Sequence, residues 1–274
     1  MIESDEPGFD ALAARIAGVA GLDVGAYKDR CLRRRIAVRM RACGAQSYAE
    51  YLAVLEREPE ELQRLLDTLT INVTKFFRNR ETWECLAGEL LPGLIRAREG
   101  RIRVWSAGCA SGEEPYTIVM LLAQVLERMG RAAWLERVQV DATDIDRLSL
   151  ERARAARYSL RAFSEATPDI PERFCRPVDA ETVEVRAELR ARVSVRRHDL
   201  LREPPLATEY ELIVCRNVII YFDRATQERL MQRFADTLSP GGVLVLGKVE
   251  TIFGPARSRL ELVEPRERIY RKAA

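Results

Sequence analysis

The pattern of apolar and polar positions changes character near residue 80. Residues 8–70 carry apolar side chains at three- and four-residue spacings, as in FDALAARIAGVAGL and YAEYLAVLEREPEELQRLLDTL, and this spacing predicts helices. From residue 101, strand-like and helical stretches alternate through RIRVWSAG, EPYTIVMLLAQVLERM, VQVDATDID and RLSLERARAARY. Alternation of this kind predicts a parallel sheet covered by helices. We therefore expect a small all-α domain at 1–70, an interdomain segment at 71–80 and an α/β domain at 81–274.

The last third of the chain continues the alternation. YELIVCRNVIIYF is an apolar strand, ATQERLMQRFADTL is helical, VLVLGKVE is a strand, and LELVEPRERIYR has the pattern of a closing hairpin. Between the two halves, residues 159–197 hold short alternating pieces, TVEVRAEL and RVSVRR. These predict a small antiparallel β-subdomain inserted into the α/β domain.

Charge and composition exclude several classes of protein. The 44 Lys and Arg residues are nearly balanced by 42 Asp and Glu, so the chain is not a wholly basic nucleic-acid binder. Its single histidine, His198, and six cysteines without a CxxC pair argue against a metal site. No apolar run approaches the length needed to span a bilayer. We expect reduced thiols, a cytoplasmic location and no membrane insertion.

Candidate chemistry begins in VWSAGCASGEEPY, residues 104–116. A strand that ends in Gly108, with Gly112 four residues later, lets the backbone approach a ligand before a helix starts. Glu113 and Glu114 at that helix start would repel a phosphate but suit a cationic amine or sulfonium, which indicates S-adenosylmethionine. The next strand ends in TDID, where Asp144, with Asp146 in reserve, is placed to accept hydrogen bonds from ribose hydroxyls. The alternative is that the glycines only turn the chain and Asp144 caps the following helix.

Five stretches occur in one order: TINVTKFFR (70–78), WSAGCASGEEPYTI (105–118), ATDID (142–146), CRNVIIYF (215–222) and LSPGGVLVLG (238–247). Together they closely resemble the CheR family, the glutamate O-methyltransferases of chemotaxis receptors. The resemblance implies a Rossmann-like S-adenosylmethionine-dependent methyltransferase domain with a small antiparallel β-subdomain, preceded by a helical domain. The chain departs from the family at GKVE (247–250), where a GHSE-like segment is expected, and at Asp199, where asparagine is common.

The resemblance also implies site residues. Besides Gly108, which the strand-end pattern indicates, it places cofactor contacts at Asn72, Thr74, Arg78, one of Glu113 and Glu114, Asp144, Asp199, Leu200, Asn217 and Val218. It implies S-adenosyl-L-homocysteine as the product and receptor glutamates as the substrate. Arg78 and Tyr221 are the candidates for aligning the acceptor carboxylate, which is ionised at neutral pH and needs no general base. The alternatives are a salt bridge for Arg78 and simple packing for Tyr221.

KDRCLRRRIAVRMR, residues 28–41, has seven basic residues in fourteen. On a helix, Leu32, Ile36 and Met40 form one apolar stripe, with Lys28, Arg35 and Arg39 on one side of it. The basic face on the other side consists of Arg30, Arg33, Arg34 and Arg41. Given the resemblance, we expect this face to dock the cytoplasmic helical domain of a receptor, with the protein acting as a monomer. A solvated face paired with local glutamates is the alternative.

Two other functions are weighed against receptor methylation. One is methylation of nucleic acid, although the chain has CRNVIIYF where base-modifying enzymes commonly carry a DPPY-like segment. The other is a non-catalytic regulator that binds S-adenosylmethionine or S-adenosylhomocysteine. The insert lacks a glycine-rich turn between its strand-like pieces, so we expect it not to bind a receptor's C-terminal pentapeptide.

Overall fold

The computed structural model describes residues 6–20, 24–69, 74–97 and 101–273. The chain divides into two compact units, which are described separately. One unit comprises Met1–Asn72 with Tyr221–Thr226, and the other comprises Val73–Ile220 with Gln227–Ala274. No helix within the described ranges combines the length and the apolar character that crossing a membrane requires.

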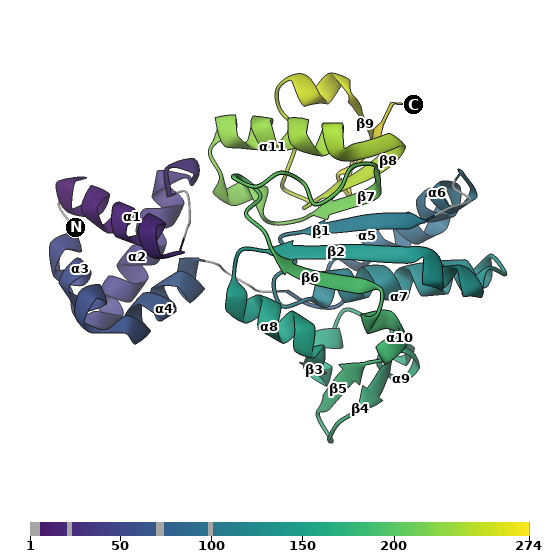
Figure 1. Ribbon diagram of the computed structural model, residues 1–274, viewed down its shortest axis with the longest axis horizontal. Coiled ribbons are helices and arrows are strands. Elements are labelled where there is room, and N and C mark those ends of the chain that lie inside the picture. The colour runs from purple at the N-terminus through teal and green to yellow at the C-terminus, as the bar shows by residue number, and fades with distance from the viewer. Residues whose placement is uncertain (1–5, 21–23, 70–73, 98–100, 274) are drawn as a thin grey trace. The chain divides into compact units, whose positions relative to one another are not determined.

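The first unit is helical, as the apolar spacing predicts (Figure 1). Leu32, Ile36 and Met40 are all buried, which confirms the apolar stripe of the basic helix. That helix ends at Gly44, whose left-handed φ of 74° suits glycine. The helices of this unit are α1 (Glu6–Ala20), η1 (Val24–Ala26), α2 (Asp29–Cys43), α3 (Tyr48–Arg57) and α4 (Pro59–Leu69).

The second unit is built on a mostly parallel sheet in the order β6-β2-β1-β7-β8-β10-β9. β1, β2, β6, β7 and β8 pair in parallel, and β10 and β9 add an antiparallel edge. The middle strand β7 is buried at every position, as a strand covered on both faces must be. The strands are β1 (Ile102–Ala107), β2 (Val138–Asp144), β6 (Val193–Arg197), β7 (Tyr210–Cys215), β8 (Leu238–Leu246), β9 (Leu260–Glu264) and β10 (Ile269–Lys272). β9 and β10 confirm the predicted closing hairpin.

Helices cover both faces of this sheet. Figure 1 shows α7 and α8 on one side and α11 on the other. Side chains of α7 and the sheet form one apolar core, which includes Val104, Ile118, Val140 and Val214. The helices are α5 (Arg80–Cys85), the π-helical η2 (Leu86–Leu90), α6 (Leu91–Ala97), α7 (Glu113–Arg128), η3 (Ala132–Arg137), α8 (Arg147–Ala155), η5 (Ile219–Tyr221), α11 (Arg224–Thr237) and η6 (Pro255–Ser258).

The insert contains a three-stranded antiparallel sheet in the order β3-β5-β4. TVEV forms its central strand, but RVSVRR does not belong to it. The latter is β6, which pairs in parallel with β2 in the main sheet, so the upper limit of 197 for the β-subdomain is wrong. An edge strand has the same alternating sequence pattern in either sheet, so only its pairing partner shows to which sheet it belongs. The elements of the insert are β3 (Arg157–Ser159), η4 (Leu160–Phe163), α9 (Asp169–Phe174), β4 (Cys175–Pro177), β5 (Thr182–Val185) and α10 (Ala187–Arg190).

Candidate active site

The turn after β1 needs a glycine at position 108. Gly108 has a φ of +85°, and a Cβ placed there would lie 2.4 Å from Cγ2 of Val218. The backbone N–H groups of Gly108 and Cys109 both donate to the carbonyl oxygen of Thr143, at 2.8 and 2.9 Å. The turns that follow β1 and β7 therefore approach closely, and the structure brings the predicted residues Gly108 and Val218 together.

The two carboxylates of TDID have separate roles. Asp146 caps α8 by accepting hydrogen bonds from the Leu148 N–H (3.1 Å) and the Ser149 hydroxyl (2.7 Å). Asp144 instead accepts from the N–H groups of Ala110 (2.8 Å) and Asp146 (3.0 Å), which joins the end of β2 to the turn after β1. Burial raises the pKa of Asp144. The helix-capping alternative thus falls to Asp146, and the oxygens of Asp144 keep acceptor capacity for a ligand.

Glu113 and Glu114 begin α7 and take different partners. The Ser111 hydroxyl donates to Glu113 at 2.7 Å, within the preceding turn. The Ser106 hydroxyl, on β1, donates to Glu114 at 2.8 Å. Burial raises the pKa of Glu113, and it raises the pKa of Glu114 to about 7, although Arg216 lowers the latter. Of the pair, Glu114 is the carboxylate held against the sheet.

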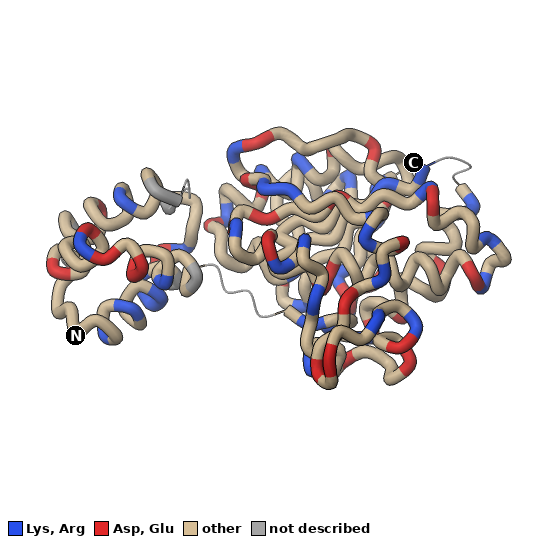
Figure 2. The backbone as a smooth tube through the Cα atoms, turned by 60° about the horizontal axis from the view of Figure 1, so that its bottom comes forward, with Lys and Arg blue, Asp and Glu red and all other residues tan. Residues whose placement is uncertain are grey.

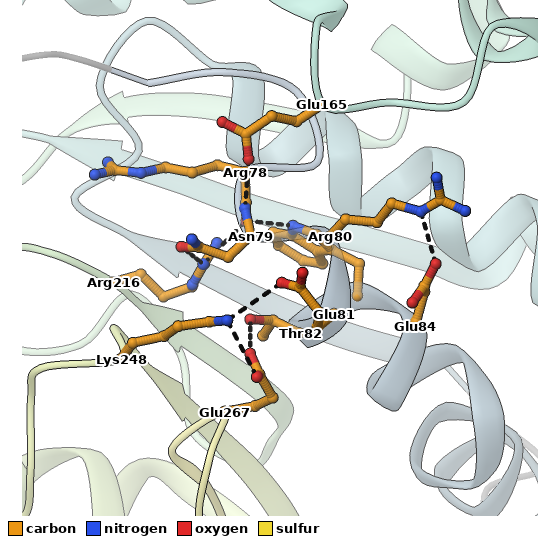
Figure 3. A network of polar contacts seen from close by, with 11 residues as sticks. Arg78, Asn79, Arg80, Glu81, Thr82, Glu84, Glu165, Arg216, Lys248 and Glu267 are labelled. Carbon is orange, nitrogen blue, oxygen red and sulfur yellow. Dashed lines mark hydrogen bonds and ion pairs between the residues drawn. The ribbon is translucent and has the colours of Figure 1, made fainter.

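Arg78 lies in a strained turn that several segments hold in place. Its neighbours Phe77 and Asn79 have positive φ values of 54° and 58°, which non-glycine residues rarely adopt. The carbonyl oxygen of Arg78 accepts from Nε1 of Trp83 and from Nη2 of Arg216, both at 3.0 Å (Figure 3). The backbone conformation around Arg78 is therefore fixed by its surroundings.

Two further hydrogen bonds secure this turn from other elements. The Phe77 N–H donates to the Thr117 hydroxyl of α7 at 3.0 Å. The Asn79 N–H donates to Oε2 of Glu165, in the insert, at 2.8 Å. Strain of this kind persists only where neighbours over-determine the backbone, and it gathers at functional sites.

Arg216, between Cys215 and Asn217, is a site residue that the sequence prediction did not include. It is 6% exposed, and its Nη2 also donates to Oδ1 of Asn79 at 2.8 Å. Burial lowers the pKa of Arg216, and its Nε has no hydrogen-bond partner among the described residues. A charged residue directly after an apolar strand was the available signal, because an arginine is rarely buried without a purpose.

Glu250 is a second residue that the prediction omitted. Its carboxylate accepts from the N–H groups of Gly247 (2.6 Å), Asn217 (3.0 Å) and Ile220 (3.3 Å). Asn217 has a positive φ of 60°, so Glu250 stabilises a second strained turn. Burial raises the pKa of Glu250. The glutamate of GKVE thus shapes the backbone around the predicted residues Asn217 and Val218.

Asp199 and Leu200 follow β6. The Asp199 carboxylate accepts from the N–H groups of Leu201 (2.8 Å) and Arg202 (3.2 Å), so it stabilises its own turn. The carbonyl oxygen of Leu200 accepts from Arg233. The nearby His198 bonds the carbonyl oxygen of Pro204 through Nε2, at 2.9 Å.

Three predicted site residues, Asn72, Thr74 and Tyr221, are not among the contacts described above. Thr74 is half-buried ahead of the Arg78 turn, and Asn72 lies outside the described residues. Tyr221 is grouped with the helical unit, where the Arg35 guanidinium lies over its ring, 4.3 Å from the centroid. The backbone N–H of Lys28 donates to the Tyr221 carbonyl oxygen at 2.8 Å.

Three arginines of α2 contact other side chains or the backbone, and three are exposed. Arg35 is buried and donates to the Leu69 carbonyl, and Arg39 pairs with Glu61 at 2.6 Å. On the predicted docking face, Arg33 pairs with Asp29 at 2.8 Å and lies over the Phe9 ring. The other three, Arg30, Arg34 and Arg41, are exposed. Elsewhere basic and acidic positions are interspersed along the backbone (Figure 2).

The residues at the strand ends fit S-adenosylmethionine. The contact of Gly108 with Val218 leaves backbone rather than side chain at the turn, as close approach by a ligand requires. Glu114 is a desolvated carboxylate suited to a ligand ammonium, and the unpartnered Nε of Arg216 shows that the local polar groups are incompletely satisfied. These features suit a ligand that carries both charges and a ribose.

Comparison with known proteins identifies the family. Residues 72–269 match the CheR methyltransferase SAM binding domain, and residues 7–70 match the CheR all-alpha domain. A chemotaxis protein methyltransferase of Listeria monocytogenes is 35% identical over 237 residues, covering 86% of this chain and 87% of that protein. One of Klebsiella aerogenes is 39% identical over 249 residues, covering 88% and 82%. One of Salmonella typhimurium is 36% identical over 237 residues, covering 84% and 79%.

The chain belongs to the CheR methyltransferase family and is an S-adenosylmethionine-dependent methyltransferase. The predictions of an all-α domain followed by a Rossmann-like methyltransferase domain, and of methylation in chemotaxis, are confirmed. A nucleic-acid methyltransferase and a non-catalytic regulator are not favoured.

Proposed function

We propose that this member of the CheR family methylates side-chain carboxylates of glutamates on the cytoplasmic helices of chemoreceptors, forming glutamate methyl esters. The observation that carries the proposal is Arg78, a guanidinium on a strained turn that three separate elements hold in place. A guanidinium binds a carboxylate through paired hydrogen bonds, so an Arg78 whose backbone is fixed can orient the acceptor.

A carboxylate acceptor also accounts for the absence of a basic catalyst in the sequence motifs. The only histidine, His198, bonds the Pro204 carbonyl. A glutamate with a pKa near 4.3 is already a nucleophile at neutral pH, so no proton has to be removed. S-adenosylmethionine, when bound, supplies an electrophilic methyl group on a sulfonium. The chain's own contribution is alignment, which can be worth several kcal/mol of the barrier.

The residues at the strand ends would hold the cofactor. We assign the ribose hydroxyls to Asp144 and the methionyl ammonium to Glu114 rather than Glu113, because the Ser106 hydroxyl on β1 holds the buried Glu114 carboxylate near the end of that strand. The backbone of Gly108 would admit the cofactor to the turn. The remaining cofactor contacts that we propose are Asn72, Thr74, Asp199, Leu200, Asn217 and Val218.

The exposed arginines of α2 are proposed as the docking face for the receptor. Arg30, Arg34 and Arg41 have no ion pair with a described residue, and an acidic helix would supply one. Arg33 contributes less to this face, since Asp29 already offsets its charge. We further propose that the protein acts in the cytoplasm as a monomer and does not bind the C-terminal pentapeptide of the receptor.

The proposal is tested with S-adenosylmethionine labelled in its methyl group and receptor-containing membranes. A glutamate methyl ester releases labelled methanol on treatment with base, whereas an N-methyl group does not. We expect base-labile label on the receptor with the unaltered protein. We also expect at least tenfold slower transfer with Arg78→Ala, because positioned charged hydrogen bonds are worth about 1.5–3 kcal/mol, and a smaller loss with Tyr221→Phe. Base-stable label, or full activity in Arg78→Ala, would overturn the assignment.

A further inference from the structure

Lys248 joins three segments that are far apart in the sequence. It lies in the loop after β8, in the GKVE segment that departs from the family pattern. Its Nζ is 3.2 Å from Oε2 of Glu81, in the first turn of α5, and 3.2 Å from Oε1 of Glu267, between β9 and β10 (Figure 3). One ammonium group therefore ties the loop after β8 to the start of α5.

Of the two carboxylates that Lys248 contacts, Glu267 is the buried one. Glu267 is 8% exposed, and the hydroxyl of the buried Thr82 donates to its Oε2 at 2.6 Å. A carboxylate in such a place needs a cation, and loss of the cation leaves a desolvated charge. Lys248 offsets that charge and at the same time fixes the first turn of α5, on which Thr82 lies.

The first turn of α5 is continuous with the strained turn of Arg78. The Thr82 N–H donates to the Asn79 carbonyl oxygen at 2.9 Å, so the place where α5 begins determines where the Arg78 turn lies. Two residues beyond Lys248, Glu250 holds the N–H groups of Asn217 and Ile220. The loop at 247–250 thus contacts the Asn217 turn directly through Glu250, and through Lys248 it contacts the first turn of α5, which continues the Arg78 turn.

We propose that Lys248 is a positioning residue for methyl transfer, which keeps the Arg78 turn in register with the Asn217 turn. The proposal rests on the assigned role of Arg78 in binding the cofactor and aligning the acceptor. Lys248 itself does not touch the reacting groups; Figure 3 shows the Arg78 side chain extending away from the Lys248 cluster. Its effect reaches the site through Glu267, Thr82 and the backbone of Asn79.

Calorimetric titration of the full chain with S-adenosylhomocysteine tests this without a receptor. We expect Lys248→Met to weaken binding about three- to tenfold, which lies within the range typical for residues that act through a coupled contact, and Lys248→Arg to restore most of the affinity. The matched control is Arg80→Met. Arg80 pairs with Glu84 at 2.6 Å within the same helix, so its loss breaks an ion pair on α5 without separating segments. Arg80→Met is expected to leave the affinity unchanged.

A double variant separates this inference from the role of Arg78. If Lys248 acts through Arg78, Lys248→Met causes no further loss of affinity in the Arg78→Ala background. Full additivity, or a lower melting temperature with unchanged affinity in Lys248→Met, would overturn the inference while the role of Arg78 stands. Unchanged affinity and unchanged methyl transfer in Arg78→Ala would instead overturn the role of Arg78, and this inference with it.

Discussion

Glu61 in the helical unit and Glu114 in the methyltransferase unit are both withdrawn from solvent, yet their pKa values shift in opposite directions. Glu61 is 1% exposed and accepts from Arg39 (2.6 and 3.0 Å) and from the Tyr51 hydroxyl (2.8 Å). Burial alone would raise the pKa of Glu61, but these hydrogen bonds outweigh it and the pKa is lowered. Glu114 accepts from the neutral Ser106 hydroxyl, and burial raises its pKa to about 7.

The difference separates a carboxylate that stabilises the fold from one that is prepared for a ligand. In the helical unit the counter-charge comes from the chain itself, and the pair is complete. At the start of α7, Arg216 and Arg78 lower the pKa of the carboxylate but do not offset its desolvation. The remaining cost to the free protein favours binding of a ligand ammonium. Mutation should therefore affect stability at the first site and binding at the second.

Glu61→Gln is expected to have the largest effect on folding. Glu61 is the buried member of an ion pair with the partly exposed Arg39, and removing its charge is expected to lower the free energy of unfolding by about 2 kcal/mol. Chemical denaturation followed by circular dichroism measures it. Glu60→Gln is the matched control, because Glu60 pairs with Arg64 at 3.0 Å but is 85% exposed. If Glu61→Gln and Glu60→Gln lowered the free energy of unfolding equally, the buried ion pair would contribute no more to stability than the exposed one.

The lowered pKa of Glu61 also gives its contribution a pH dependence. The stabilisation is fully present above the pKa of about 4.3 that a glutamate has in the unfolded chain, and it is lost as the pH falls through the lower folded value. The stability difference between the unaltered protein and Glu61→Gln should therefore shrink in acid.

Glu114→Gln is expected to act on the cofactor instead. Loss of a charged hydrogen bond to the ammonium should weaken S-adenosylhomocysteine binding about tenfold or more, with no loss of thermal stability because a desolvated charge is removed. Glu113→Gln, measured by the same calorimetry, should change the affinity little. If Glu113→Gln weakened binding more than Glu114→Gln did, the ammonium contact would be assigned to Glu113 instead.

The pH dependence of binding sharpens the same assignment. With a pKa of about 7, Glu114 is largely protonated at pH 6 and ionised at pH 8, and only the ionised form attracts an ammonium. Affinity for S-adenosylhomocysteine should rise across this interval in the unaltered protein and stay flat in Glu114→Gln. Because its folded pKa is raised, Glu114 lowers the stability of the free protein progressively as the pH rises from about 4.3, the value in the unfolded chain, to about 7, and the loss is constant above that.

The smallest effect is expected on the exposed face of α2. Reversing Arg30 and Arg34 to Glu should raise the apparent KM for receptor a few-fold, and added salt should weaken the unaltered protein similarly. The free energy of unfolding should change by less than about 0.5 kcal/mol, since both side chains are exposed. Arg57→Glu, at an exposed position of α3, is the control. Unchanged receptor methylation with loss of binding to nucleic acid would replace docking by a phosphate-binding role.

Local patterns in the sequence were sufficient for the elements and for several single residues. The apolar stripe of Leu32, Ile36 and Met40 follows from helical spacing, and the need for glycine at 108 follows from a strand that must turn at once into a ligand site. Helical spacing also predicts the ion pair of Arg33 with Asp29, because residues four apart on a helix are neighbours. The predicted docking face includes Arg33, whose charge Asp29 offsets within the same helix.

Only the tertiary structure decided which of several equivalent residues faces which partner. Glu113 and Glu114 are indistinguishable in sequence, and they differ because β1 places Ser106 against one of them. The same holds for RVSVRR, whose strand pattern does not specify its sheet, and for Lys248, whose partners lie 167 residues before it and 19 residues after it. Periodicity fixes which face of an element is buried, whereas contacts between distant segments depend on how the elements pack, and the chemistry of this site depends on those contacts.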